Sequence, residues 1–152
     1  MTKVTRKAGS VGFDDLKIRI TELNKLSAFV GWLESAKYDD NTPVAGVAAV
    51  HEYGSPARAI PPRPFFRVAI EKNYDDWMQL IKSGAQSILK GEMDAEQVMN
   101  LIGLKSSGDV KNAIVDLKTP PLKPETIRRK GQSDLLRDTG LLLATLTYEV
   151  RE

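Results

Sequence analysis

The single histidine of the chain, His51, stands directly beside Glu52, and this pair is the first place to look for acid–base or metal chemistry. Two ligands on one helix need a spacing of three or four residues, because only those side chains share a face. Adjacent residues do not, so the pair lacks metal-ligand spacing. The sequence also has no cysteine, which excludes thiolate ligands, disulfides and cysteine nucleophiles. We therefore expect a buried or capping histidine, no metal site and no cofactor.

The triplet Asp138-Thr139-Gly140 matches the tripeptide of aspartic proteases in its letters. A retroviral-type protease monomer would be shorter and all-β, whereas helical patterns precede the triplet here. We interpret Asp138 or Thr139 as the cap of a short helix or turn that begins at Gly140. A glycine-rich phosphate loop is also missing, because the stretch 103–108 lacks a strand before it and a lysine after it. The sequence predicts that this protein is not an enzyme.

Three arginines, Arg58, Arg63 and Arg67, lie in a stretch with no acidic residue between Glu52 and Glu71. Such a local excess of positive charge could face phosphates or an acidic partner. The net charge of the whole chain is only +2, which is small for a dedicated nucleic-acid-binding protein. Any basic surface must therefore be local.

The prolines of the same stretch, Pro61, Pro62 and Pro64, make it stiff and extended, because each fixes φ and removes an amide donor. Pro64 is suited to be the first residue of the following helix, where the missing N–H costs nothing. Gly54 is suited to end the preceding helix in a left-handed cap. On these features alone, the stretch is a rigid connector between two helices.

A second basic region runs from residue 118 to residue 137, with six basic residues against two acids. Its candidate phosphate-facing residues are Lys123, Arg128, Arg129 and Lys130. Together with the three arginines above, they could form a positive surface for DNA. No helix-turn-helix, zinc-finger or base-stacking motif accompanies them, so a solvated basic face remains the alternative.

The composition is that of an ordinary globular protein, with 152 residues, 41% hydrophobic and 28% charged. This length suits one domain with a real core, and we expect it over residues 13–152 behind a mobile basic arm at residues 1–12. No apolar run approaches the ~20 residues of a membrane span, so we expect no membrane partner. We expect a cytoplasmic protein.

Hydrophobic periodicity predicts a helix up to residue 25, a strand within residues 26–35, a helix over residues 43–53 and a long helix from residue 66 to residue 88. The apolar face of the long helix extends over about seven turns and is expected to be core. It is made by Phe66, Ile70, Tyr74, Trp77, Leu80, Ile81, Ala85 and Ile88.

After Gly91, a new helix is expected from Asp94, and the sequence Ser106-Ser107-Gly108-Asp109 is expected to break it into two segments. A short basic helix at residues 125–130 and a half-buried strand at the C-terminus follow. Without a βαβ rhythm, the order of elements favours an α+β fold, with a small antiparallel sheet covered by a long amphipathic helix and several shorter ones.

The order of these motifs resembles the tail-completion, or neck, proteins of long-tailed bacteriophages and prophages, which include head–tail joining and minor tail proteins. The resemblance covers roughly residues 28–151. The matching residues are His51-Glu52-Tyr53-Gly54, Ile60 to Arg67, Pro120-Pro121-Leu122, Thr126-Ile127-Arg128, Lys130-Gly131, Leu135-Leu136, Asp138-Thr139-Gly140-Leu141 and Tyr148-Glu149-Val150.

The resemblance implies a structural virion protein that is made in the bacterial cytoplasm and forms a ring, typically of six copies, at the head-proximal end of the tail. The ring would join the tail tube to the head connector, with DNA passing through its lumen without sequence-specific binding. Such a subunit could be a monomer until its template is present. The expected partner interface consists of Arg58, Ile60, Pro61, Pro62, Arg63, Pro64, Phe65 and Arg67, and the expected structural turns are Gly54, Asp138, Thr139 and Gly140. The alternative is a small DNA-binding accessory protein that uses its basic surface.

Overall fold

Two strands from distant parts of the chain, β1 (Ser27–Trp32) and β2 (Leu146–Arg151), pair as an antiparallel sheet in which Val30 lies opposite Tyr148. The period-two alternation of apolar and polar residues predicted the second strand, and this prediction is confirmed. The strand expected within residues 26–35 is confirmed as well, with narrower bounds.

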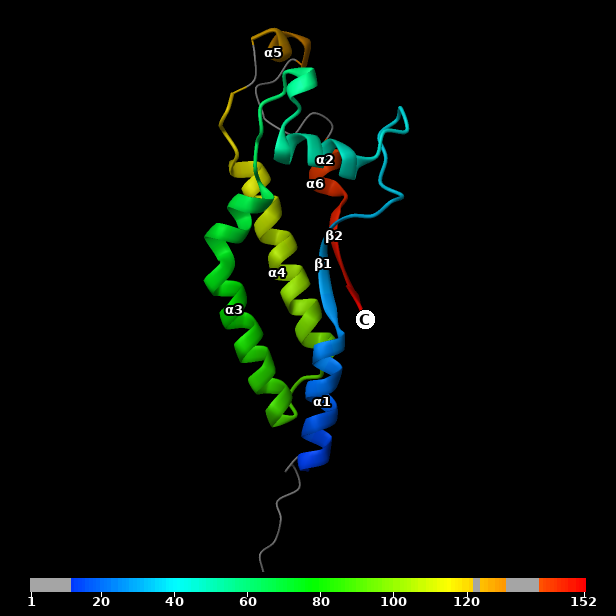
Figure 1. Cartoon of the computed structure of the whole chain (residues 1–152), viewed down its shortest axis with the longest axis vertical. Helices are drawn as coiled ribbons and strands as arrows, with labels where there is room; N and C mark the ends of the chain where they lie inside the picture. The colour runs from blue at the N-terminus through cyan, green and yellow to red at the C-terminus, as the bar shows by residue number, and fades with distance from the viewer. Residues whose placement is uncertain (1–11, 122–123, 131–139) are drawn as a thin grey trace, which may run out of the picture.

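The computed structural model describes residues 12–121, 124–130 and 140–152. Its two-stranded sheet and helices confirm the predicted α+β class (Figure 1). The two longest helices, α3 (Phe66–Lys90) and α4 (Ala95–Asp116), form a hairpin, and α4 contacts both α3 and the sheet. α4 is therefore the central helix, and both α3 and the sheet pack against it. The arm expected at residues 1–12 lies outside the described residues, apart from its last residue.

The turn between α3 and α4 is defined by a glycine and a capping box. Gly91 has a φ of 75° and caps α3 in the left-handed conformation. The side chain of Asp94 accepts a 2.8 Å hydrogen bond from the amide of Gln97, whose own side chain accepts one of 3.0 Å from the amide of Asp94. The predicted stop at Gly91 and restart at Asp94 are both confirmed.

The predicted break at residues 106–109 is wrong, because α4 continues through them as one helix. The Ser106 hydroxyl donates to the Ile102 carbonyl at 2.7 Å, and the Ser107 hydroxyl donates to the Leu104 carbonyl at 3.0 Å. Both serines thus bond back within the helix instead of capping a new one. Packing on both sides of α4 outweighs the weak helix propensity of this stretch.

The sheet packs closely against α4 at Gly103. A Cβ atom at this position would lie 2.3 Å from a ring carbon of Tyr148, far inside van der Waals contact. Glycine lets the ring of Tyr148 lie directly on the helix backbone. This contact fixes the distance between β2 and α4.

Among the described residues, the buried apolar side chains form two clusters. The larger one joins α2 (Val44–Tyr53), α6 (Leu141–Ala144), the upper parts of α3 and α4, and the sheet. The smaller one, at the far end of the hairpin, is built from Ile88, Ala95 and Val98. Leu23 of α1 (Phe13–Lys25) and Leu26, the residue that follows this helix, pack against it. The largest fully buried side chains are Phe65, Ile88, Ile114, Leu146, Val44, Val98 and Val110.

The expectation that the whole apolar face of α3 is core is only partly confirmed. Ile88 is buried, as predicted, but Ile70, Tyr74 and Ile81 are 45%, 56% and 36% exposed. α3 packs on α4 and also contacts α1, but the exposure of these three side chains shows that the described residues leave this side of α3 largely uncovered. Only part of the predicted core face is therefore core.

Two short helices complete the described residues, a 3₁₀ turn η1 (Pro56–Arg58) and α5 (Pro124–Lys130). α2 begins one residue later than the sequence predicts, with Pro43 as its N-cap. In the ranges that the structure describes, no helix combines the length and apolarity that crossing a membrane requires.

Candidate partner-binding site

The carboxylate of Glu52, on α2, caps the N-terminus of α3. It accepts hydrogen bonds from the backbone amides of Phe65 at 2.7 Å, Phe66 at 2.9 Å and Arg67 at 3.3 Å. These amides have no partner inside their own helix, and the N-terminus of a helix favours a negative charge. Glu52 is only 4% exposed, so water cannot take the place of these hydrogen bonds, which join α2 to α3.

Arg67 neutralises this buried carboxylate from the first turn of α3. Its Nε donates to Glu52 Oε1 at 2.9 Å, and its Nη2 donates to the Glu52 carbonyl at 2.8 Å. Its guanidinium also lies over the ring of Tyr53, 5.5 Å from the centroid. Burial acts against the charged form of Glu52, but the bonds from Arg67 and the three amides outweigh it and lower the pKa of Glu52. We call Glu52, Arg67 and the amides of residues 65–67 the Glu52 clamp.

Pro64 is not the first residue of α3, contrary to the sequence-based expectation. The helix begins at Phe66, and Phe65 is its N-cap residue. As N-cap, Phe65 donates its amide to Glu52. Pro64 instead ends the extended segment that leads into the helix.

The segment of residues 55–64, which we call the proline loop, closes back on itself beside the clamp. Ser55 and Ile60 pair through two hydrogen bonds of 2.9 and 3.0 Å around the turn η1. Gly54 ends α2 as predicted, but its φ of 76° and ψ of 175° are not the left-handed cap that the sequence predicts. A Cβ atom at this position would lie 2.9 Å from the Pro62 nitrogen, so only glycine fits. The loop is therefore held at both ends.

Arg63 anchors the loop from inside. It is 5% exposed, its amide donates to the His51 carbonyl at 2.6 Å, and its Nε donates to the Pro120 carbonyl at 3.2 Å. Burial lowers the pKa of Arg63. This arginine ties α2, the proline loop and the segment after α4 together.

The buried positions of Arg63 and Phe65 correct their assignment as direct partner contacts. Phe65 is fully buried and packs edge-on against Trp32 of β1, with ring centroids 6.1 Å apart. Of the eight expected interface residues, Ile60 and Pro64 are half-buried, and four are exposed: Arg58, Pro61, Pro62 and Arg67. The exposed ones form the outer surface of the loop, and the buried ones hold it in place.

The second basic region is only partly described. Arg128 is exposed on α5, while the side chains of Arg129 and Lys130, and all of Lys123, lie outside the described residues. Asp138 and Thr139 lie outside them as well, so their predicted capping role is not placed. Gly140 is described, and it is itself the N-cap of α6, with a φ of 70°.

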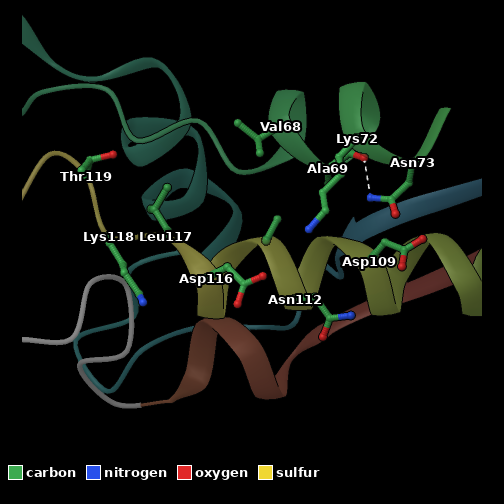
Figure 2. Close-up of a pocket in the computed structure, with 11 residues that line it drawn as sticks. Val68, Ala69, Lys72, Asn73, Asp109, Asn112, Asp116, Leu117, Lys118 and Thr119 are labelled. Atoms are coloured by element: carbon green, nitrogen blue, oxygen red, sulfur yellow. Dashed lines mark hydrogen bonds between the residues drawn. The ribbon is translucent and has the colours of Figure 1, made fainter.

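A pocket of about 270 Å³ lies between the first turns of α3 and the last turns of α4 (Figure 2). Lys72 and Asn73 line it from α3, and Asp109, Asn112 and Asp116 line it from α4. The amide group of Asn73 donates to the Ala69 carbonyl of its own helix at 2.8 Å. The charged residues of its lining are of both signs, with Lys72 and Lys118 beside Asp109 and Asp116.

Asp109 of this pocket is already satisfied by structural partners. Its carboxylate accepts a 2.7 Å bond from Trp77 Nε1, and Lys105 Nζ donates to both of its oxygens at 2.7 and 2.8 Å. These contacts tie α3 to α4 and leave Asp109 8% exposed. Its carboxylate therefore serves helix packing.

In the described ranges, no group of three or more histidine, aspartate or glutamate side chains is placed to hold a metal ion. No protein-family model, no curated protein and no solved structure matches this chain.

Sequence reasoning missed the roles of Glu52 and Asp109. A signal existed for Glu52, because the helix after the prolines starts at Phe65-Phe66 and offers no serine, threonine, aspartate or asparagine as its own N-cap. The cap therefore had to come from another part of the chain, and Glu52 is the nearest acidic residue before this helix. No comparable signal in the sequence pointed to the pairing of Asp109 with Trp77.

Proposed function

We propose that this protein is a tail-completion or neck subunit of a long-tailed bacteriophage or prophage. In this role it assembles as a ring at the head-proximal end of the tail and joins the tail tube to the head connector, and DNA passes through the lumen. The observation that carries the proposal is the Glu52 clamp. It links the two most distinctive motifs of the resemblance, residues 51–54 and residues 60–67, into one rigid unit.

The clamp gives the proline loop a physical reason to serve as a docking element. Arg58, Pro61 and Pro62 are exposed on a loop whose ends are fixed by the bonds of Ser55, Arg63 and Glu52. A segment that is already ordered loses less conformational entropy on binding than a flexible one. A small surface of this kind can therefore bind usefully during assembly.

The direct test is complementation of tails and heads that lack this protein. Adding the purified chain should restore infectivity, and electron microscopy should show added density at the head–tail junction. Failure of both, with a protein that is folded by circular dichroism, would refute the proposal.

A second measurement separates this role from that of a DNA-binding accessory protein. A neck subunit that only surrounds DNA should show negligible retention on duplex DNA at about 0.1 M salt. Retention that falls steeply as salt rises would favour the accessory role, because each phosphate contact releases counterions. In that case, replacing the exposed Arg58 and Arg128 with serine should make DNA retention depend less steeply on the salt concentration. Replacing Arg63 would not test a surface contact, because Arg63 is buried.

A further inference from the structure

α1 presents an apolar face that the described structure leaves largely uncovered. Phe13 is 84% exposed, Ile20 is 44% exposed and Leu16 is half-buried, although the three share one helical face. No residue of α1 is buried. The helix packs on the smaller core cluster through Leu23, near its C-terminus, and its first turns extend past the end of the α3–α4 hairpin (Figure 1).

α3 carries a second uncovered apolar strip, made of Ile70, Tyr74, Met78 and Ile81. These residues follow steps of four, four and three, so they form one continuous line on the helix. Their exposed fractions are 45%, 56%, 46% and 36%. Large apolar side chains that gather on one line in this way mark a binding surface more often than scattered ones do.

We propose that the α1 face of one copy packs on the α3 strip of a second copy of this chain. Within one molecule α1 meets α3 near Ile88, at the end of α3 that lies away from Ile70 and Tyr74, because the first turns of α3 and of α1 lie at opposite ends of the long axis (Figure 1). A contact between two different surfaces is head-to-tail, and it closes into a ring when the rotation between copies allows it. This inference rests on the proposed ring assembly and names the surfaces that would build it.

The area is sufficient for such a contact. With about 200 Å² for each large side chain when fully exposed, the exposed fractions correspond to about 350 Å² of apolar surface on the strip and about 250 Å² on Phe13 and Ile20. Apolar atoms make up a little over half of a typical interface, so the whole contact would bury about 1,100 Å². With all six side chains fully covered, the contact reaches the lower limit of about 1,000 Å² for a specific interface.

The charges beside the two surfaces are complementary. Lys17 follows Phe13 by four residues and precedes Ile20 by three, so it borders the α1 face. Glu71, Asp75 and Lys82 border the α3 strip, so acids outnumber bases along its edge, and these side chains and Lys17 are all exposed. A strip with acids at its edge favours a helix with a lysine at its edge.

Disulfide capture between single-cysteine variants tests the contact, because the chain has no cysteine of its own. Ile20→Cys mixed with Tyr74→Cys should form a covalent dimer under mild oxidation. The matched control is Ile18→Cys, which is 56% exposed on the opposite side of α1. Mixed with Tyr74→Cys, it should give about tenfold less dimer, as expected when a specific contact is absent.

Two outcomes would overturn the inference. Equal capture from position 18 and position 20 would show that the contact is not specific, and stronger capture of either variant with itself would indicate a symmetric contact. Lys17→Glu in the Ile20→Cys variant should reduce capture severalfold, because it places a like charge beside Glu71 and Asp75. Unchanged capture in this variant would show that Lys17 does not pair with these acids.

The capture experiment and the complementation experiment test the contact and the neck role separately. Capture as expected without restored infectivity would refute the neck role and leave the contact standing. Restored infectivity without capture would leave the neck role standing and refute this contact.

Discussion

The carboxylate of Glu52 accepts a 2.7 Å hydrogen bond from the amide of Phe65, a residue in another element of the chain. A helix cap usually comes from the residue directly before the helix, but here it comes from α2 and crosses the whole proline loop. The loop is therefore fixed by the same bonds that start α3. Its stiffness is a property of the tertiary structure as well as of its prolines.

Replacing this acid tests the clamp directly. Glu52→Gln keeps one acceptor oxygen but removes the charge that three amides and Arg67 share, so we expect the free energy of unfolding to fall by about 1–3 kcal/mol. Urea denaturation followed by circular dichroism measures the change. Glu34→Gln is the control, because Glu34 is exposed and should change stability by less than about 0.5 kcal/mol. Equal effects of both variants would contradict the role of the clamp.

The same group should make stability depend on pH. The pKa of Glu52 is lower in the folded protein than its ordinary value of 4.5, so below that value the unfolded chain binds more protons than the folded one. The stabilising contribution is therefore complete above about pH 5 and is lost as the pH falls through the folded pKa. The stability difference between the wild type and Glu52→Gln should narrow in this range. A difference that stays constant down to acid unfolding would contradict the lowered pKa.

The sequence predicted those elements whose signals are local. The glycine at position 91 and the capping pair Asp94 and Gln97 act within a few residues, and the alternation in β2 depends only on its own side chains. The α+β class followed from the order of such signals. Local chemistry of this kind is readable before any tertiary contact is known.

The remaining features depend on contacts between distant residues. Ser106 and Ser107 resemble a helix start, but packing of α4 between α3 and the sheet keeps them helical. Glu52 could not be recognised as a cap until α2 and α3 were placed together. The apolar line on α3 was readable, but its exposure was not, because periodicity shows that a face is apolar and not what covers it.

Two glycines of α4 provide a matched pair that tests the packing of the sheet. Gly103→Ala would place a Cβ atom 2.3 Å from the Tyr148 ring, so we expect a loss of about 1–3 kcal/mol in the free energy of unfolding. Gly108→Ala meets no atom within 4 Å and should stabilise the same helix by about 0.5–1 kcal/mol. Thermal denaturation of the two variants should shift in opposite directions. Shifts in the same direction would contradict the close contact between β2 and α4.

Removing the stiffness of the proline loop tests whether the loop is more than a connector. Pro61→Gly with Pro62→Gly leaves the Glu52 clamp and the Arg63 anchor intact, so the fold should persist with a loss of about 1–2 kcal/mol from the freer unfolded chain. A docking loop that must now be ordered on binding should weaken assembly by about tenfold. Complementation of defective particles at a series of protein concentrations measures this shift. Arg58→Ala in the intact loop separates the two contributions, because it removes an exposed contact without changing stiffness. If the double variant assembles as well as the wild type at every concentration while Arg58→Ala does not, the arginine and not the stiffness makes the loop a docking element.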